Sequence, residues 1–297
     1  MVRTVLVRLK GLPPMVMPSS TLPIIFTDLD GSLLDHYTYS FSAAGGLLKK
    51  LESLDIPVVP VTSKTYCEVL RLRDVMDNQH PFVSENGAAV FIPRGYFSRR
   101  PKGFSEQGKF WVYRNCRSRE YWLEVLDKKA GAFDGEFETF SSIVDKQGIQ
   151  GLVQLTGLST QQAALSHRRE HSEPILWTGT EKRKKLFVET LSKGDVRLVQ
   201  GGRFLSLGGH SDKGKALLQL QSIYAANNKS ATIQSLAVGD GMNDIGMLEA
   251  ASCALIIKST NHQPPALSRA DNTFLSTKTG PQGWVEGVST WLKIVSF

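Results

Sequence analysis

The stretch Ile24-Ile25-Phe26-Thr27-Asp28-Leu29-Asp30-Gly31-Ser32-Leu33-Leu34 decides the fold, because an apolar run of strand type ends in two carboxylates and a glycine. A second stretch of the same kind, Val238-Gly239-Asp240-Gly241-Met242-Asn243-Asp244, lies far downstream. If both apolar runs are strands of one parallel sheet, their carboxylates meet at its carboxyl edge. Carboxylates that meet repel one another, and a hard cation such as Mg²⁺ would most simply offset the repulsion. The pair therefore predicts a cation site at this edge.

Strand and helix signals alternate around the first stretch. Short apolar runs predict strands over 24–27, 57–61 and 81–83, and helical spacing predicts helices over 40–54 and 64–77. Strands that alternate with helices favour a parallel sheet with right-handed crossovers. The predicted fold class is therefore α/β, with a Rossmann-like parallel-sheet core.

The middle of the chain has a different character. Residues 92–110 are rich in Gly, Pro, Arg and Lys and show few periodic signals. Three helices are predicted in this region. The first lies near 119–129, the second begins at Ser159, where Ser159 and Gln162 form a capping box, and the third runs over 180–192. Strands are predicted at 175–177, 196–199 and 204–207. This mixture predicts an inserted α+β domain with an antiparallel sheet.

The α/β pattern then resumes. Helices are predicted over 213–226, 243–251 and 283–292, and strands over 235–238 and 253–257. The expected organisation has three parts: an N-terminal extension over 1–20, a catalytic core over 21–91 and 209–297, and an inserted cap over 92–208.

The composition is that of an ordinary globular protein, with 41% hydrophobic and 21% charged residues in a chain of 297. No apolar run approaches the roughly 20 residues that span a bilayer, and Met1–Lys10 lacks the apolar core of a secretory signal. The three cysteines, Cys67, Cys116 and Cys253, show neither metal spacing nor a disulfide framework. We therefore expect a cytoplasmic protein with no membrane partner.

The net charge of +7 favours an anionic ligand. Part of this charge sits in Glu181–Lys185, where no aromatic residues interleave with the charges as stacking on single strands would require. The run indicates a solvated helix face, so we expect no nucleic-acid partner. Monomer and homodimer both remain open as oligomeric states.

Asp28 and Asp30 have the spacing that phosphoryl chemistry needs. In an extended segment residues i and i+2 point the same way, so one carboxylate could attack phosphorus while the other exchanges a proton with the leaving oxygen. We expect the Asp28 carboxylate to lie in a solvated cleft. The plainer interpretation of Asp-x-Asp-Gly is a turn with helix-capping carboxylates.

Four further residues fit the same chemistry. Thr62 would present a hydroxyl and an N–H group at the end of its strand, although it could equally cap the helix over 64–77. Lys213 could neutralise an attacking carboxylate and phosphoryl oxygens. Asp240 could bind the cation directly, with Asp244 holding a water or supporting the site, although acidic residues are also common in a first helical turn.

These features, in this order, resemble the haloacid dehalogenase superfamily over roughly residues 22 to 297. The insertion is similar to the type-two caps of its sugar phosphatases. The resemblance implies that Asp28 is the nucleophile and Asp30 the general acid/base, and that Thr62 and Lys213 bind the phosphoryl group. It also implies that Mg²⁺ is held by Asp28, the Asp30 carbonyl and Asp240, with Asp244 in support.

A finer resemblance is to the mannosyl-3-phosphoglycerate phosphatase family. It rests on these motifs, in order: Val61-Thr62-Ser63-Lys64-Thr65, Ser84-Glu85-Asn86-Gly87-Ala88, Leu155-Thr156-Gly157-Leu158-Ser159, Arg169-Glu170-His171-Ser172-Glu173, Gly201-Gly202-Arg203-Phe204, Asp212-Lys213-Gly214 and Gly280-Pro281-Gln282-Gly283-Trp284. The resemblance implies hydrolysis of 2-(mannosyl)-3-phosphoglycerate to the compatible solute mannosylglycerate. The partner is then a small phosphorylated sugar acid, and the implied substrate-binding residues are Ser63, Lys64, Asn86, Gly87, Arg169, Ser172 and Arg203.

That substrate carries a phosphate and a carboxylate, which suit cationic partners. Arg169 and Arg203 offer bidentate contacts, Lys64 a point charge, and Asn86 hydrogen bonds to sugar hydroxyls. Arg169 could instead be a charged helix end, and Arg203 a surface strand residue.

The sequence departs from the family after Gly-Gly-Arg-Phe. Leu205 and Ser206 stand where the family usually places an aromatic residue and a histidine, with His210 close by. A phosphatase of another phosphosugar, such as glucosyl-3-phosphoglycerate, sucrose phosphate or a hexose phosphate, therefore remains an alternative, and a phosphomutase is a weaker one. A phospho-accepting signalling module is disfavoured, because such receivers are far shorter and have no use for the insertion.

Overall fold

The computed structural model describes residues 21–200, 203–229 and 231–295, which fall into two compact units. Unit 1 contains the described residues of Met1–Thr62, Met76–Tyr113 and Asp212–Phe297, and unit 2 contains those of Ser63–Val75 and Arg114–Ser211. The expected extension over 1–20 lies outside the described residues.

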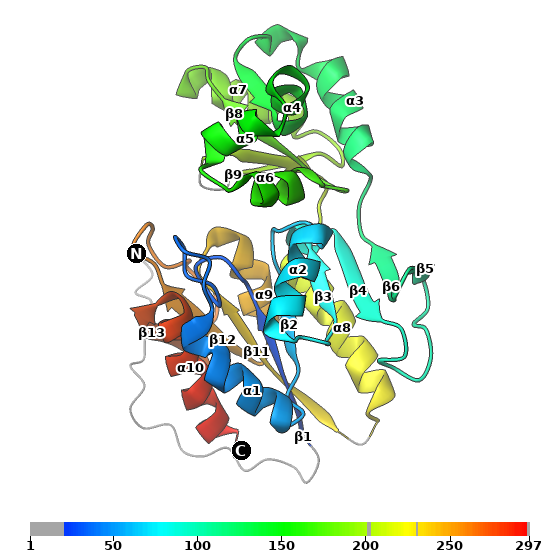
Figure 1. Cartoon of the computed structure of the whole chain (residues 1–297), viewed down its shortest axis with the longest axis vertical. Helices are drawn as coiled ribbons and strands as arrows, with labels where there is room; N and C mark the ends of the chain where they lie inside the picture. The colour runs from blue at the N-terminus through cyan, green and yellow to red at the C-terminus, as the bar shows by residue number, and fades with distance from the viewer. Residues whose placement is uncertain (1–20, 201–202, 230, 296–297) are drawn as a thin grey trace. The chain divides into compact units, whose positions relative to one another are not determined.

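A five-stranded parallel sheet forms the centre of unit 1, in the order β13-β12-β11-β1-β2 (Figure 1). Its strands are β1 (Thr21–Thr27), β2 (Val58–Pro60), β11 (Thr232–Gly239), β12 (Cys253–Lys258) and β13 (Thr273–Thr279). β1 and β11 are neighbours in register, with Thr27 opposite Val238. The residues that follow these two strands therefore emerge next to each other.

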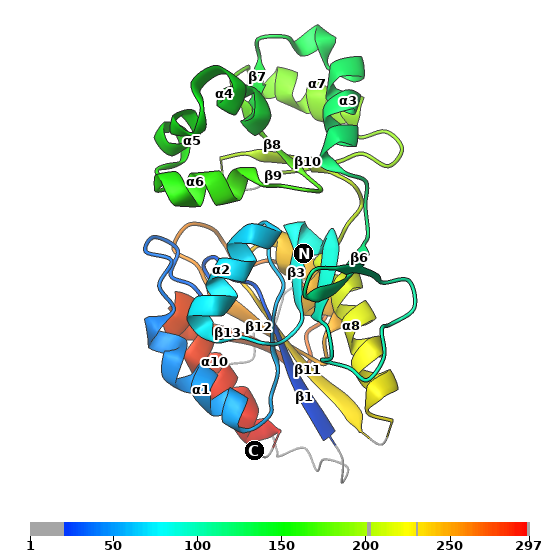
Figure 2. The ribbon, with the colours of Figure 1, turned by 45° about the vertical axis from the view of Figure 1, so that its right-hand side comes forward.

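Helices cover the two faces of this sheet (Figures 1 and 2). They are α1 (Gly45–Ser53), α8 (Lys213–Asn227), α9 (Ile245–Ala250) and α10 (Gly280–Ile294), with short 3₁₀ turns η1 (Ser42–Ala44), η2 (Glu85–Gly87) and η4 (Met242–Asp244). Side chains alternate along β1, so Phe26 packs in one core cluster with Leu217 of α8, whereas Thr27 faces Trp284 of α10. Gly287 lets α10 approach β12 closely, because a Cβ there would overlap the Leu255 side chain.

A second, smaller sheet in unit 1 has the order β3-β4-β6-β5. Its strands are β3 (Phe82–Ser84), β4 (Ala89–Pro93), β5 (Ser105–Gln107) and β6 (Phe110–Arg114). Phe82 and Phe91 stack with ring centroids 4.7 Å apart, and Trp111 belongs to the same core cluster as Phe26. Residues 92–113 therefore group with unit 1, whereas we placed the start of the insertion at residue 92.

Unit 2 contains an antiparallel sheet in the order β7-β8-β10-β9. Its strands are β7 (Phe137–Thr139), β8 (Glu173–Trp177), β9 (Arg197–Gln200) and β10 (Leu205–Gly208). Its helices are α3 (Arg119–Lys129), α4 (Phe140–Gln147), α5 (Ile149–Thr156), α6 (Thr160–His167), α7 (Glu181–Leu191) and most of α2 (Tyr66–Met76), with the 3₁₀ turn η3 (Gly131–Phe133). Trp122, Phe187 and Leu207 lie in the core between this sheet and helices α3 and α7.

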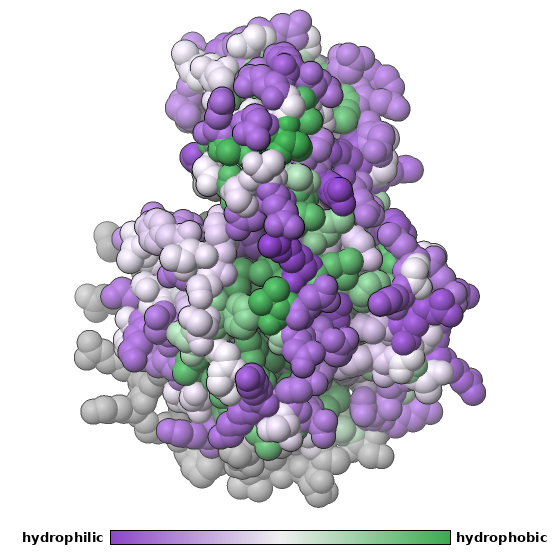
Figure 3. Space-filling model, viewed as in Figure 1, coloured by the Kyte–Doolittle hydropathy of each residue, from purple (hydrophilic) through white to green (hydrophobic). Residues whose placement is uncertain are grey.

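The predicted fold class is confirmed: an α/β core with a parallel sheet and an additional α+β part with an antiparallel sheet. The capping box is also present, since Ser159 Oγ accepts from the Gln162 N–H group and the Gln162 side chain accepts from the Ser159 N–H group. Most of the visible surface is hydrophilic, with smaller hydrophobic areas between (Figure 3). Within the described residues, no helix combines the length and the apolar character needed to cross a membrane.

Candidate active site

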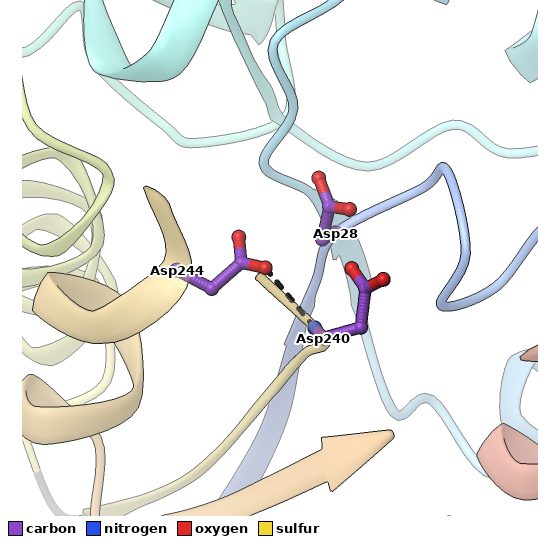
Figure 4. A group of neighbouring side chains, drawn as sticks. All are labelled: Asp28, Asp240 and Asp244. Atoms are coloured by element: carbon purple, nitrogen blue, oxygen red, sulfur yellow. Dashed lines mark hydrogen bonds between the residues drawn. The ribbon is translucent and has the colours of Figure 1, made fainter. Parts of the chain in front are cut away.

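The carboxyl edge of the parallel sheet brings the two acidic stretches together. The Asp28 N–H group continues the pairing of β1 with β11 by donating to the Val238 carbonyl at 2.8 Å. Asp28 and Asp240 then leave their strands as neighbours, and Figure 4 shows both carboxylates pointing into the space that Asp244 also faces. The sequence prediction that residues so far apart meet at this edge is thus realised in the structure.

Three carboxylates form the centre of the site. Asp28, Asp240 and Asp244, called the carboxylate cluster below, each offer an oxygen within 4.8 Å of the others. The Lys213 ammonium lies 2.6 Å from Asp28 Oδ1 and 2.6 Å from Asp244 Oδ1, and its residue is only 1% exposed. One cation therefore bridges two buried carboxylates.

Local backbone contacts hold Lys213 and Asp244 in place. Asp212 caps α8 by accepting from the N–H groups of Gly214 at 2.8 Å and Lys215 at 3.1 Å, which fixes Lys213 in the first helical turn. Asp244 Oδ2 accepts from the N–H groups of Asp240 at 3.1 Å and Gly241 at 2.9 Å. Asp244 therefore shapes the loop that presents Asp240.

The backbone at Asp28 has a support that we did not predict. Thr27 Oγ1 donates to the Asp28 carbonyl at 2.7 Å, and Trp284 Nε1 donates to Thr27 Oγ1 at 3.1 Å. Thr27 and Trp284 are completely buried. A residue of the last helix thus holds the backbone of the first acidic stretch.

Burial dominates the electrostatics of the cluster. It raises the pKa of the Asp28 carboxyl well above its ordinary value; Lys213 opposes this rise, while the charges of Asp244 and Asp240 add to it. Burial also raises the pKa of Asp240 to about 6, with Asp244 adding to the rise and His262 opposing it. Burial alone would lower the pKa of Lys213, but Asp244 and Asp28 outweigh it, so this pKa is raised and the ammonium stays charged.

These charges suit a hard divalent cation. Three carboxylates face one ammonium, and the raised pKa of two of them indicates that their negative charge is incompletely compensated. Carboxylate oxygens are the ligands that Mg²⁺ prefers. The backbone also approaches closely at Gly31, where φ is +76° and a Cβ would lie 2.6 Å from Asp240 Oδ2. The donor set therefore fits the cation that the sequence implies.

A pH dependence of stability follows from Asp240. The pKa of Asp240 is about 6 in the folded state, above the ordinary aspartate value of 3.8. At pH values between 3.8 and 6 the folded protein therefore binds more protons than the unfolded protein. The free energy of unfolding should therefore fall as pH rises through this window, by roughly 3 kcal/mol at most. Denaturant titrations in chelator at pH 4.5 and 7.5, with Asp240→Asn as the reference that lacks this carboxyl, measure the difference. A wild-type protein that gains stability relative to Asp240→Asn with rising pH would contradict the assignment.

The other predicted core residues lie around the cluster. Asp30 is half-buried, and its backbone forms an isolated bridge with Leu34. Its carboxylate is not part of the acidic group found among the described residues. Asp28 is 5% exposed, so the expected solvated cleft around its carboxylate is wrong, because the strand ends and Lys213 enclose it.

Thr62 is buried at the end of the segment after β2. Its N–H group donates to the Val83 carbonyl at 3.1 Å, and its carbonyl accepts from the Asn86 N–H group at 2.9 Å. The alternative that Thr62 caps the following helix is wrong, because α2 begins at Tyr66 and Thr65 forms the reciprocal capping bonds with Glu68. Thr62 is thus placed by neighbouring strands and not by the helix.

Asn86 and Gly87 both have positive φ, +57° and +96°. The Asn86 side-chain oxygen accepts from Asn243 Nδ2 at 3.2 Å, which connects its loop to the loop of Asp240 and Asp244. A Cβ at Gly87 would overlap the Asp212 backbone. Both residues therefore belong to the packing around the carboxylate cluster.

Three of the predicted substrate-binding residues meet in unit 2. Arg169 Nη1 donates to the Ser63 carbonyl at 3.2 Å and to Ser172 Oγ at 3.0 Å. Lys64, next to Ser63, lies 3.9 Å from the Glu68 carboxylate.

Arg203 lies elsewhere in unit 2. Its two terminal nitrogens donate to the carbonyls of Leu155 at 2.9 Å and Thr156 at 3.0 Å, at the carboxyl end of α5. Arg203 therefore caps this helix, a contact that the sequence did not indicate. The glycines before it, 201 and 202, lie outside the described residues.

Comparison with known sequences agrees with the site. The profile described as haloacid dehalogenase-like hydrolase matches residues 25–99 and 201–281. A glucosyl-3-phosphoglycerate/mannosyl-3-phosphoglycerate phosphatase from Methanococcoides burtonii is 32% identical over 273 residues, which are 88% of this chain and 94% of the relative. A phosphatase of the same name from Persephonella marina is 30% identical over 270 residues, covering 89% of this chain and 95% of the relative.

Solved structures share the fold. A phosphatase of the haloalkanoate superfamily from Bacteroides thetaiotaomicron superposes with a TM-score of 0.64 at 17% identity, covering 96% of this chain and 99% of that one. The resemblance seen in the motifs is thereby confirmed. The chain belongs to the haloacid dehalogenase-like hydrolase family and is a phosphoric monoester hydrolase.

Proposed function

We propose that this enzyme is a Mg²⁺-dependent phosphatase that hydrolyses 2-(mannosyl)-3-phosphoglycerate to mannosylglycerate and phosphate. The observation that carries the proposal is the buried contact of Lys213 with Asp28 inside the carboxylate cluster. The substrate is supported by the two relatives, whose name includes both the mannosyl and the glucosyl compound. The glucosyl compound is therefore the nearest alternative substrate.

In the proposed mechanism, Asp28 attacks phosphorus and forms an aspartyl phosphate while the ester P–O bond breaks. Asp30 protonates the leaving oxygen, then takes a proton from the water that hydrolyses the aspartyl phosphate. Lys213 orients Asp28 through the 2.6 Å contact, and Thr62 and Lys213 bind phosphoryl oxygens. Mg²⁺, held by Asp28, the Asp30 carbonyl and Asp240 with Asp244 in support, would neutralise charge on the phosphoryl group.

The proposed substrate-binding residues are Ser63, Lys64, Asn86, Gly87, Arg169, Ser172 and Arg203. We also propose a cytoplasmic location, since Cys67, Cys116 and Cys253 form no disulfide in the described part of the chain.

A substrate panel tests the proposal. Phosphate release is measured with Mg²⁺ and with chelator on mannosyl- and glucosyl-3-phosphoglycerate, sucrose phosphate, hexose phosphates and an aryl phosphate. We expect the highest kcat/KM on the mannosyl compound, and no turnover in chelator. A preference for sucrose phosphate or a hexose phosphate would overturn the substrate, and a single stable phosphorylation without turnover would overturn the reaction.

Arg169 should distinguish the proposed substrate from a generic one. Arg169→Ala is expected to lower kcat/KM on the glycosyl-phosphoglycerate about tenfold or more, because a charge-assisted contact with the substrate is lost. Its effect on the aryl phosphate should stay within about twofold. Arg168→Ala removes the neighbouring arginine and serves as the control. Equal losses on both substrates would show that Arg169 does not contact the part of the substrate beyond the phosphate.

A further inference from the structure

Unit 1 contains a cavity of about 940 Å³ that the proposed mechanism does not use. It is lined by the loop that starts at the last residue of β12, Lys258–Pro264, and by Leu275–Thr277 of β13. β12 is the neighbour of β11, the strand that leads to Asp240. The cavity therefore borders the same carboxyl edge as the carboxylate cluster, on the Asp240 side.

The lining of this cavity is rich in hydrogen-bond donors and contains no carboxylate. The loop contributes the Lys258 ammonium, the Asn261 amide, the His262 ring and hydroxyl groups. The β13 wall has less to offer a ligand, because Thr277 Oγ1 already donates to Glu286 at 2.8 Å. Within the described residues, Lys258 forms no ion pair, and its side chain is exposed. Such a lining suits an anionic group.

Two contacts join the cavity loop to the catalytic edge. His262, a lining residue, places Nε2 at 3.3 Å from Asp240 Oδ2. Asn261 Oδ1 accepts from the hydroxyl of Tyr37, which belongs to the loop after the first acidic stretch, at 3.1 Å. A ligand that reaches the cavity from the carboxylate cluster would therefore meet this loop first.

We propose that the cavity is a subsite for the carboxylate of the substrate, with Lys258 as its charge partner; this inference rests on the proposed phosphoglycerate substrate. In a 3-phosphoglyceryl group the carboxyl carbon is only three bonds from the ester oxygen. A carboxylate so close to the transferred phosphoryl group needs a cationic site directly beside the cluster. Lys258 supplies the cation, whereas Asp240 excludes the carboxylate from the cluster itself by charge repulsion.

The test compares two phosphate esters that differ at one carbon. 3-Phosphoglycerate carries a carboxylate where glycerol 3-phosphate carries a hydroxymethyl group. We expect Lys258→Met to lower kcat/KM on 3-phosphoglycerate about tenfold, mainly through KM, and to leave glycerol 3-phosphate within about twofold. Lys258→Arg should retain most of the activity, because it keeps the charge. Lys278→Met, which removes an exposed lysine of β13 outside the lining, is the control.

An equal loss on both esters, or an equal effect of Lys278→Met, would overturn the subsite. Inhibition of aryl phosphate hydrolysis by glycerate distinguishes an incorrect subsite from an incorrect proposed function. If the wild type hydrolyses aryl phosphate but no phosphoglycerate, the proposed substrate is wrong. Glycerate should still inhibit aryl phosphate hydrolysis, about tenfold more weakly in Lys258→Met, if the subsite exists. Inhibition that is absent or independent of Lys258 would overturn the inference as well.

Discussion

Asp28→Asn is expected to lower kcat on every substrate by on the order of a thousandfold or more, while the protein stays folded. The amide cannot attack phosphorus, so the aspartyl phosphate does not form. The fold should tolerate the change because the Asp28 carboxyl is buried beside two other carboxylates, and burial already disfavours its charge. In chelator the free energy of unfolding should stay the same or rise by about 1 kcal/mol, since Lys213 keeps Asp244 as its partner.

Phosphate release and denaturant unfolding measure these two effects, and mass spectrometry excludes deamidation back to aspartate. Asp35→Asn is the matched control. Asp35 lies in the same loop region and is half-buried, and within the described residues its carboxylate accepts from Tyr37 and Thr38 of its own loop. Its activity should stay within about twofold of wild type. An Asp28→Asn protein with near wild-type turnover would show that another residue is the nucleophile.

Lys213→Met should cost both activity and stability. It removes the ammonium that lies 2.6 Å from both Asp28 and Asp244 and leaves these carboxylates buried without their counter-charge. Breaking a buried ion pair from one side typically costs about 3–5 kcal/mol. Turnover should fall at least about a hundredfold, because the nucleophile loses its orienting contact and the phosphoryl oxygens lose a cation.

Unfolding in chelator and with Mg²⁺ measures the stability effect, and Mg²⁺ should restore part of the loss by supplying positive charge. Lys215→Met is the control, since Lys215 is exposed in the same helical turn. Adding Asp244→Asn to Lys213→Met should recover stability in chelator, because one of the two facing charges is removed. If the free energy of unfolding of Lys213→Met equals that of the wild type, the buried contacts of Lys213 with Asp28 and Asp244 do not stabilise the fold.

The carboxylate cluster could be predicted because Asp28 and Asp240 each follow a strongly apolar strand, and Asp244 lies four residues after Asp240. The runs before Asp28 and Asp240 are buried on both faces, so they stand out by composition alone. Parallel pairing then places their ends together. Lys213 was found through its position at the start of a helix in the right order along the chain.

Other parts of the site depend on tertiary contacts that leave little sequence signal. Trp284 and His262 reach Thr27 and Asp240 from distant elements. Trp284 belongs to the motif Gly280–Trp284, but nothing in that motif indicates the bond to Thr27, and His262 has no distinctive local pattern. Thr65 is different, because Glu68 three residues later is the capping-box pattern and would have indicated the start of α2.

The sequence analysis did not predict several helices and strands that are short or partly exposed. β13 is an edge strand whose last three residues are exposed, so its alternation is weak. α4 and α5 have eight residues each and are separated by Gly148, which breaks the helical period. The hairpin of β5 and β6 lies in a region rich in turn residues, where cross-strand packing on Phe82 and Phe91 decides the structure.

The bond from Trp284 to Thr27 has a consequence for truncation. α10 contains none of the proposed catalytic residues, yet its indole holds the hydroxyl that in turn binds the Asp28 carbonyl. A chain that stops before Gly280 would keep all three residues of the carboxylate cluster and still lose the anchor of its nucleophile. Premature termination or proteolysis before α10 would therefore abolish activity. A preparation should be checked for intact α10 before its activity is measured.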